Sequence, residues 1–529
     1  MQSRAFVVAT ALSAALVSGG WFLQRGFHGG RGAADGARLY DDVASHIRRF
    51  YVDSIDDGEL QRKAVDGILL ELHDPHSVYL DSKRLARLNE STSGRYAGIG
   101  IQMDVREGFV IVIAPLPGTP AERAGLQTGD RIVAIDGRPT DKWTSDEALK
   151  ALRGTPGTSV RLDIDRPGMD SRLHFTIARQ EIQFHAVQHA VMLGDGIGYV
   201  DLTNFSESAA TDLRGAIDSL RRVGMKGLVL DLRGNPGGLL DAGVAVSELF
   251  LDPGQKIVSM RGRTPDANRE YTDQAAQPFA DLPMVVLQDS ASASASEIVA
   301  GALQDHDRAA IVGTASYGKG SAQSLYRMPD GGALKLTTAL WYTPSGRSIN
   351  RPRVVREEES NEAPSSFTLD TTESARPFRT AMGRRVSGGG GIHPDVLVTE
   401  RALSEADLEL QRALGAGIPK FRDALVAYAL QVKGRRQVST PDFVVTPAMR
   451  EELLQQMRAR GLEVDSLTYA RATPTIDRLL GRTIAQYVFG RSGEAIRSAR
   501  DDSSVVKAIE LLRGARTPRE VIERTTSSR

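Results

Sequence analysis

The sequence predicts a multidomain α/β protein, in which a small β-rich module and helical regions accompany a larger α/β core. Three observations lead to this prediction. The chain has 529 residues, which is too long for one compact core. Short apolar runs separated by Gly and Pro fill residues 94–179, whereas residues 197–312 alternate strand-like and helix-like segments. Alternation of this kind is typical of a parallel-rich sheet that is covered by helices.

Composition argues against several classes of function. Lys plus Arg number 66 and Asp plus Glu also number 66, so no net charge favours nucleic acid, and we expect no such partner. Cys is absent, which excludes disulfides, a thiol nucleophile and thiolate metal sites. Because no His-Glu-x-x-His or other clustered ligand pattern occurs, we expect neither a metal nor a cofactor.

Residues 5–23 are the first distinctive segment, 19 uncharged residues that Arg4 precedes and Arg25 follows closely. This length suffices for a membrane-spanning helix and exceeds that of an ordinary signal-peptide core. No small-x-small cleavage site follows closely, and Trp21 suits a membrane interface. We therefore expect residues 1–36 to form a membrane anchor and a connector, with a cleaved signal peptide as the alternative.

Helical periodicity marks both flanks of the chain. In residues 37–93, apolar side chains recur every three or four positions, as at Leu39 and Val43. Residues 401–529 are also helical in pattern and rich in charge. Their apolar series predicts core packing within this extension rather than a partner site: Leu453, Met457, Leu462, Ile476, Leu479, Leu480, Ile484 and Val488.

Residues 289–298 carry four alternating serines between a buried strand and a helix. A serine at the start of a helix lies among backbone N–H groups that can stabilise developing negative charge. A structural alternative also fits, because Ser294 and Glu297 have the spacing of a capping box. The serine segment alone therefore leaves catalysis and helix capping both open.

Two further segments strengthen the catalytic interpretation. Residues 317–323 read Tyr-Gly-Lys-Gly-Ser-Ala-Gln, and Lys319 and Gln323 would face the same side of an extended strand. Residues 231–238 read Asp-Leu-Arg-Gly-Asn-Pro-Gly-Gly after a buried strand, and the two final glycines offer unobstructed N–H groups. An exposed turn lysine and an ordinary β-to-α turn are the structural alternatives.

Together these segments resemble the carboxy-terminal processing proteases, also called tail-specific proteases. The resemblance covers about residues 37–400. It implies a crotonase- or ClpP-like serine protease core over residues 181–400 and a PDZ domain over residues 94–180. The motifs that carry it lie at residues 231–238, 292–298 and 317–323, with further similar segments at residues 74–79, 343–349 and 391–396.

The resemblance also implies the roles of individual residues. A lysine that acts as a base must be uncharged, although the ordinary pKa of lysine is about 10.4. We therefore expect this lysine to be shielded from water and from carboxylates, and no acidic residue occurs between residues 309 and 328. The implied roles are Ser294 as nucleophile, Lys319 as general base, Gln323 as its positioning partner, and the N–H groups of Ala295 and of Gly237 or Gly238 as the oxyanion hole.

The resemblance to a PDZ domain depends on residues 96–101 and 120–132. It implies that the C-terminal end of a substrate adds a strand to a sheet edge, while loop amides bind its carboxylate. Arg153 matches an arginine that couples the PDZ domain to the active site in some relatives. The implied amides are those of Gly98, Ile99 and Gly100, and the implied apolar pocket is lined by Ile101, Leu149 and Leu152.

We therefore expect a serine endopeptidase that cleaves exported proteins with free, apolar C-terminal ends. The expected location is the cell envelope, on the periplasmic side of the inner membrane, or outside the cell if the N-terminal segment is cleaved. The family's helical region, here residues 37–93, can support a homodimer.

Three other functions remain as alternatives. The first is a PDZ scaffold with an inactive protease fold. The second is a nucleotide-binding ATPase, since residues 313–319 have P-loop spacing, although Gly320 replaces the required Ser or Thr. The third is a penicillin-recognising enzyme that uses Ser316 in Ser-x-x-Lys, although its companion motifs are absent.

Overall fold

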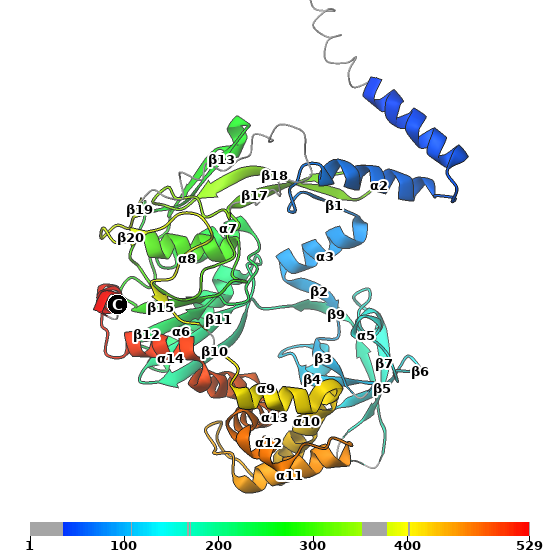
Figure 1. Ribbon diagram of the computed structural model, residues 1–529, viewed down its shortest axis with the longest axis vertical. Helices are drawn as coiled ribbons and strands as arrows, with labels where there is room; N and C mark the ends of the chain where they lie inside the picture. The colour runs from blue at the N-terminus through cyan, green and yellow to red at the C-terminus, as the bar shows by residue number, and fades with distance from the viewer. Residues whose placement is uncertain are drawn as a thin grey trace, which may run out of the picture. The chain divides into compact units, whose positions relative to one another are not determined.

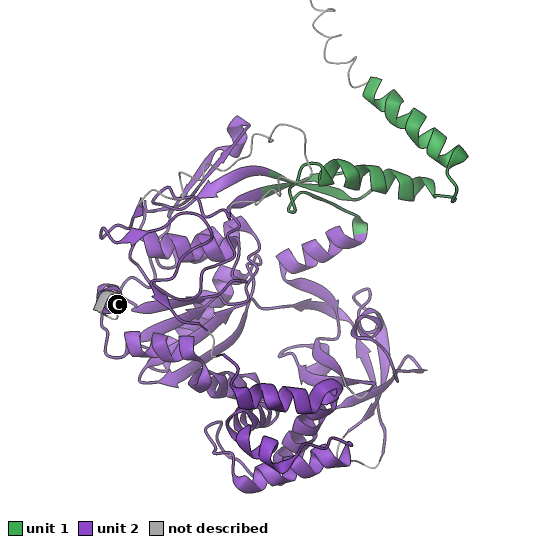
Figure 2. Ribbon diagram, in the orientation of Figure 1, with its two compact units in different colours: residues 1–82, 323–337 green, residues 83–322, 338–529 purple. Residues whose placement is uncertain are grey.

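The structure is a computed structural model that describes residues 35–106, 108–166, 169, 171–351, 378–399 and 402–527 (Figure 1). Two compact units divide the chain (Figure 2). The smaller unit comprises residues 1–82 and 323–337, and the larger comprises residues 83–322 and 338–529. The predicted anchor at residues 5–23 lies outside the described residues. No helix within the described ranges is long and apolar enough to cross a membrane.

The smaller unit combines helices with a pair of strands. A helix covers residues 35–50, and α2 (Asp57–Leu70) follows, capped by the carboxylate of Asp56. The sequence predicted helix here but missed β1 (Val78–Leu80), which pairs antiparallel with the first part of β18 (Ala333–Tyr342). Apolar side chains of both helices stay exposed, among them Leu39, Val43, Phe50, Ile68 and Leu70.

The motif at residues 74–79 holds these two strands together. Ser77 Oγ donates a hydrogen bond to Asp74 Oδ2 at 2.6 Å and accepts one from the Thr337 N–H at 3.1 Å. Tyr79 donates its hydroxyl proton to Asp330 in the turn between β17 (Ser321–Arg327) and β18. Within the smaller unit this motif therefore has a structural role.

The predicted β module folds as an antiparallel sheet around its own apolar core. The strands follow the order β3-β4-β5-β7-β8, so β3 lies at an edge of the described sheet, and β2 pairs separately with β9. Val112, Ile132 and Leu162 are fully buried in its core. The elements are β2 (Arg95–Gly98), β3 (Ile101–Arg106), β4 (Phe109–Pro115), α4 (Pro120–Arg123), β5 (Arg131–Ile135), β6 (Arg138–Pro139), α5 (Ser145–Leu152), β7 (Ser159–Asp165), β8 (Leu173–Ala178) and β9 (Gln180–Gln183).

The larger unit contains the α/β layers that the alternating pattern predicts. Its central sheet follows the order β10-β11-β12-β15-β16-β21 and is parallel from β11 onward, with β10 antiparallel at one edge. Three helices pack on one face. The elements are β10 (Val187–Gly194), β11 (Ile197–Leu202), α6 (Ala209–Arg222), β12 (Gly227–Asp231), α7 (Leu240–Glu248), β15 (Met284–Gln288), α8 (Ala295–Asp305), β16 (Ala310–Gly313) and β21 (Val396–Leu397).

Successive side chains of the central strands serve two different cores. In β12, Leu228 and Leu230 pack with α6, α7 and α8, whereas Val229 between them faces the opposite side. On that side the sheet packs against α14 (Ser503–Leu512) and α15 (Pro518–Ser527), which lie beside it in Figure 1. The C-terminal extension therefore supplies one covering layer of the central sheet, which the sequence analysis did not anticipate.

The rest of the extension forms a helical bundle with a core of its own. All eight residues of the predicted apolar series belong to this core or pack against it, so the expected packing is confirmed. Ile113 of β4 also joins it, and Arg491 contacts both Gln102 of β3 and Gln188 of β10. The bundle elements are α9 (Glu405–Leu414), α10 (Ile418–Arg435), α11 (Pro447–Ala459), α12 (Ser466–Arg471) and α13 (Thr473–Asp501).

Further strands that the sequence analysis did not predict complete the described fold. β13 (Lys256–Gly262) pairs antiparallel with β14 (Arg269–Thr272) and with the last residues of β18, where Met260 lies opposite Trp341. β17 (Ser321–Arg327) pairs with β18. Lys319 therefore precedes the strand that contains Gln323, which corrects the expectation that both belong to one extended strand. Two short strands, β19 (Phe378–Arg379) and β20 (Arg385–Val386), form a separate hairpin.

Candidate active site

Ser294 lies in the turn between β15 and α8, in a strained backbone conformation. Its φ is +57° and its ψ is −114°, a region that residues with a side chain rarely occupy. Such strain costs about 1–3 kcal/mol and persists where surrounding contacts determine the turn. The half-buried side chain of Ser294 thus stands on a rigid turn at the start of a buried helix.

The two neighbouring serines have structural hydrogen bonds. Ser292 Oγ donates to the carbonyl oxygen of Leu232 at 2.8 Å, and Ser296 Oγ donates to that of Asn235 at 2.9 Å. Both serines are 1% exposed. Their hydroxyl groups fasten the serine segment to residues 231–238. Ser294 is therefore the member of the three whose side chain is partly open to solvent.

The glycine pair of residues 231–238 lies directly against the same turn. A Cβ atom on Gly237, where φ is +93°, would lie 2.8 Å from Ser294 Cβ and 2.9 Å from Ala295 N. Glycine is required there, because a side chain would block the Ala295 N–H. The Gly237 N–H donates to Asn235 Oδ1 at 2.9 Å. Of the two predicted oxyanion donors in this loop, Gly238 is therefore the better candidate.

Glu297 is the residue that joins the serine and lysine segments. Its side chain is 0% exposed, and its Oε2 accepts hydrogen bonds from Ser294 N at 2.7 Å and from Lys319 N at 3.0 Å. Its Oε1 accepts from Ser316 Oγ and from Gly318 N, both at 2.6 Å. Because one oxygen atom binds the backbone of both Ser294 and Lys319, these two residues lie close together.

Burial raises the pKa of the Glu297 carboxyl group, while its four hydrogen bonds act in the opposite direction. This carboxyl group lies against the backbone N–H of Lys319, and the expectation that the Lys319 amine has no carboxylate neighbour stays a prediction. The local sequence around Lys319 contains no acid, but α8 brings one from 22 positions earlier in the chain. The sequence signal for Glu297 was its capping-box spacing, which pointed only to a local role.

Lys319 itself is half-buried, and its loop has a second link to the serine segment. The Tyr317 N–H donates to the carbonyl oxygen of Ser292 at 2.9 Å. Gln323 belongs to the smaller unit, where its Nε2 donates to Thr337 Oγ1 at 3.2 Å. The structure thus brings together the segments of Ser294, Gly237 and Lys319, whereas the role of Gln323 stays a prediction.

The opposite end of α8 is held by a buried ion pair. The side chain of Arg347 is 0% exposed and that of Asp305 is 1% exposed. Arg347 Nη2 lies 2.8 Å from Asp305 Oδ1. Asp305 Oδ2 also accepts a hydrogen bond from the Ser345 N–H at 3.0 Å. The motif at residues 343–349 therefore anchors the C-terminal end of α8, the helix that follows Ser294.

The predicted peptide-binding residues occupy the region between β2, β3 and α5. Gly100 has a φ of +81°, and a Cβ atom there would lie 2.3 Å from Thr119 Cβ, so only glycine fits this turn. The three apolar residues differ in exposure. Leu152 is buried in the module's core, Ile101 is half-buried, and Leu149 is 40% exposed.

Arg153 lies at the end of α5 and contacts two neighbouring elements. Its Nη1 lies 2.8 Å from Oε2 of Glu90, which belongs to α3 (Ser82–Ser93). Its guanidinium carbon lies 5.0 Å from the centre of the Tyr96 ring. Arg153 thus links the β module to the helix that precedes it.

Two alternative functions find no support in the geometry. Ser316, the candidate nucleophile of a penicillin-recognising enzyme, is 0% exposed, donates to Glu297 and accepts from Ile392 N at 2.7 Å. In a P-loop the glycine-rich segment opens a helix. Here residues 314–320 follow β16 without helical structure and lead into strand β17.

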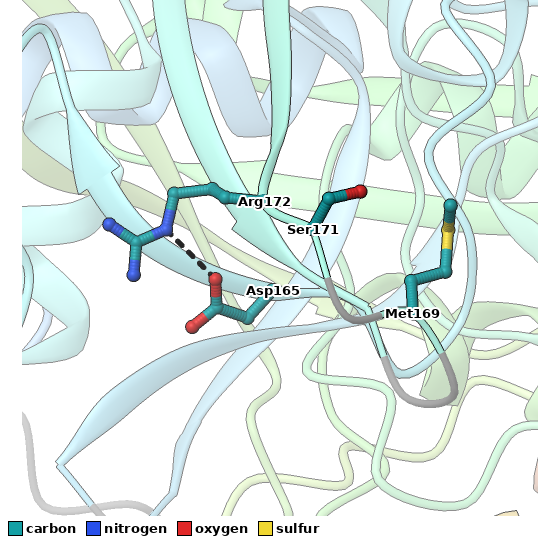
Figure 3. A pocket seen from close by; sticks show the side chains of 4 residues that line it. All are labelled: Asp165, Met169, Ser171 and Arg172. Carbon is teal, nitrogen blue, oxygen red and sulfur yellow. Dashed lines mark hydrogen bonds and ion pairs between the residues drawn. The ribbon is translucent and has the colours of Figure 1, made fainter.

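A hollow of about 490 Å³ lies elsewhere, at the hairpin between β7 and β8 (Figure 3). Its described lining includes Arg172 and Asp165. Arg172 Nε and Asp165 Oδ1 form an ion pair at 2.9 Å. Both side chains are about half exposed, so the pair is screened by water. None of the candidate catalytic residues lines this hollow.

Comparison with known proteins assigns the family. A family model described as peptidase family S41 matches residues 196–359, and a PDZ domain model matches residues 111–166. A carboxy-terminal-processing protease of Bartonella bacilliformis is 41% identical over 343 residues, which cover 63% of this chain and 78% of that protein. The chain belongs to the carboxy-terminal processing proteases. It is a serine peptidase with a PDZ domain, as the resemblance implied.

Two further comparisons describe the relatives of this carboxy-terminal processing protease. The protease CtpA of Bacillus subtilis is 31% identical over 377 residues, covering 71% of this chain and 79% of that protein. Among solved structures, a photosystem II D1 C-terminal processing protease is 27% identical, with a TM-score of 0.37, and covers 71% of this chain and 96% of that chain.

Replacing Gly237 by Ala should abolish peptidase activity, because the new Cβ atom would collide with the Ser294 turn and cover the Ala295 N–H. Gly254→Ala is the matched control. Gly254 also has a positive φ, +87°, but a Cβ atom there meets no atom within 4 Å. We expect the control to lose about 1 kcal/mol of stability and to keep its kcat. Equal kcat values for the two variants would contradict this account of Gly237.

Replacing Glu297 by Gln should lower kcat on the order of 100-fold. In the parent protein both carboxylate oxygens accept hydrogen bonds, whereas in the variant the amide NH2 group, itself a donor, would face two of these backbone or hydroxyl donors. Steady-state kinetics on a peptide substrate, with circular dichroism to verify folding, provide the measurement. Glu147→Gln is the control, since Glu147 forms an exposed capping box at α5. A folded Glu297→Gln variant with the kcat of this control would refute the bridging role.

Proposed function

We propose that this protease hydrolyses peptide bonds with Ser294 as nucleophile and Lys319 as general base, after its PDZ domain has bound the free C-terminal end of the substrate. The observation that carries the proposal is the shared Glu297 Oε2, which binds the backbone N–H groups of Ser294 and Lys319. A nucleophile and its base must lie within hydrogen-bonding reach of each other, and this arrangement brings their segments together.

The first step transfers a proton from Ser294 Oγ to the uncharged amine of Lys319, while Oγ attacks the carbonyl carbon of the substrate. This step requires a lysine without its proton, and Lys319 is half-buried rather than fully open to water.

The tetrahedral intermediate carries a negative oxygen, for which we propose the N–H groups of Ala295 and Gly238 as donors. The Ala295 N–H lies at the start of α8, where the helix dipole favours negative charge. Lys319 then gives its proton to the leaving amine, and an acyl group remains on Ser294. Water attacks this ester with Lys319 again as the base, which restores the Ser294 hydroxyl.

We further propose that the substrate's C-terminal end adds a strand beside β3, the edge strand of the PDZ sheet. The tight turn at Gly100 leads directly into β3, which places its backbone next to that edge. Amides of Gly98, Ile99 and Gly100 would bind the carboxylate, and Ile101 and Leu149 would contact the last apolar side chain.

Three expectations concern the N-terminal part of the chain. The membrane anchor at residues 5–23 and the location at the periplasmic side of the inner membrane stay predictions from the sequence. Homodimer formation through residues 37–93 is a further prediction. It is favoured by the exposed apolar side chains of this region, because soluble monomers rarely leave many such side chains uncovered on adjacent turns.

Substitution of the proposed catalytic residues tests the mechanism. Ser294→Ala and Lys319→Ala should each abolish cleavage of an unfolded protein such as casein, because one removes the nucleophile and the other the base. Ser292→Ala should retain part of the activity, since Ser292 holds the segment without reacting. Gln323→Ala should have an intermediate effect, as expected of a positioning partner. Full activity in Ser294→Ala or Lys319→Ala would exclude this mechanism.

Substrate selection is tested with proteins that differ only in their last residues. Apolar C-terminal ends should give the lowest KM, and polar or amidated ends a higher KM, because amidation removes the carboxylate that the PDZ amides bind. Ser294→Ala serves as the inactive control. In the same assay, Arg153→Ala should weaken the dependence on the C-terminal end, since it breaks the contact with Glu90. Equal KM values for all ends would argue against recognition by the PDZ domain.

A further inference from the structure

The C-terminal extension reaches the catalytic loop through one ion pair. α14 and α15 pack on the face of the central sheet opposite α6, α7 and α8. Val505, Leu511, Leu512, Val521 and Ile522 are buried there, each contributing about 1.5–3 kcal/mol of apolar burial. This packing sets the N-terminus of α14 beside the carboxyl end of β12 (Figure 1).

Asp502 caps α14 and holds a partner outside the helix at the same time. Its Oδ1 accepts hydrogen bonds from Ser504 N at 2.9 Å and from Val505 N at 3.1 Å. Its Oδ2 lies 2.8 Å from Nη1 of the Arg233 guanidinium group. The two oxygen atoms therefore have different tasks, and the capping bonds fix the direction in which Oδ2 points.

Arg233 is shared between two carboxylates from distant parts of the chain. Its Nη2 donates to Asp231 Oδ2 at 2.6 Å, and its Nε also donates to Asp231. Burial acts to lower the pKa of Arg233, but Asp231 and Asp502 together raise it above its ordinary value, so the side chain stays charged. Tyr199 completes the cluster by donating its hydroxyl proton to Asp231 at 2.8 Å.

Arg233 stands where residues 234–238 leave the sheet. The next residue begins the loop that ends in Gly237 and Gly238, and Gly237 lies against Ser294. A guanidinium group held on both sides restricts the backbone from which this loop starts. Asp231, the last residue of β12, binds the Arg233 guanidinium group from the sheet. Asp502 binds the same group from the C-terminal extension.

We propose that Asp502 is a positioning residue for catalysis, which acts through Arg233 to hold the Gly237–Gly238 loop in the geometry that the oxyanion requires. The C-terminal extension would thereby be part of the active site. This inference deepens the proposed function and rests on it, since it presumes that the loop supplies an oxyanion donor.

The test compares Asp502→Asn with Asp465→Asn in the full chain. Asparagine caps helices as well as aspartate does, so both variants should keep the melting temperature of the parent within about 2 °C. Asp465 caps α12 through bonds to Leu467 N and Thr468 N, at 2.9 and 3.0 Å. We expect Asp502→Asn to lower kcat on the order of 10-fold with KM unchanged, and Asp465→Asn to keep both constants.

A second comparison isolates the pathway through Arg233. In an Arg233→Ala background, adding Asp502→Asn should cause no further loss of kcat, because the partner of Asp502 is already gone. A kcat of Asp502→Asn equal to that of Asp465→Asn, a change confined to KM, or a full additional loss in the Arg233→Ala background would each overturn the inference. Retained activity in Ser294→Ala would instead overturn the proposed function.

Discussion

The arrangement of the candidate catalytic residues depends on the carboxyl group of Glu297, which is buried in the larger unit and binds the Ser294 turn. Burying such a group is costly unless its oxygen atoms find partners, and here both oxygens accept two hydrogen bonds each. One donor is the Ser294 N–H at the start of α8. The other three belong to Ser316, Gly318 and Lys319 in the loop before β17. A local change in either segment must therefore be accommodated by the other, because they share one acceptor group that has no capacity to spare.

Sequence reasoning succeeded where the relevant spacing is short. The pattern of a buried strand followed by a helix placed Ser294 at a helix start, as β15 and α8 have it. It failed for relations across the fold. Glu297 has the spacing of a helix cap, and nothing around Lys319 shows that a carboxyl group approaches from another element. β17 and β18 escaped because their half-buried side chains give no strict alternation.

The C-terminal extension connects the parts of the larger unit. Its bundle receives Ile113 from the PDZ domain, and Arg491 contacts a glutamine in β3 and another in β10. Its last helices then cover the central sheet. A single continuous stretch thus contacts both the strand proposed to receive the substrate's end and the sheet that carries the candidate catalytic loops. Local periodicity could predict these helices as a packed bundle, but the surfaces they contact depend on tertiary pairing that periodicity does not encode.

The position of α14 and α15 has a consequence for biosynthesis. Chains grow from the N-terminus, so Ser294 and Lys319 leave the ribosome well before residues 503–522, which bury Val229, Val285 and Leu287. Before residues 503–522 are made, the apolar side chains on that face of the sheet lack their final cover, so they contact water or a chaperone. That face of the sheet therefore gains its apolar cover only after residues 503–522 have been synthesised, well after the two candidate catalytic residues.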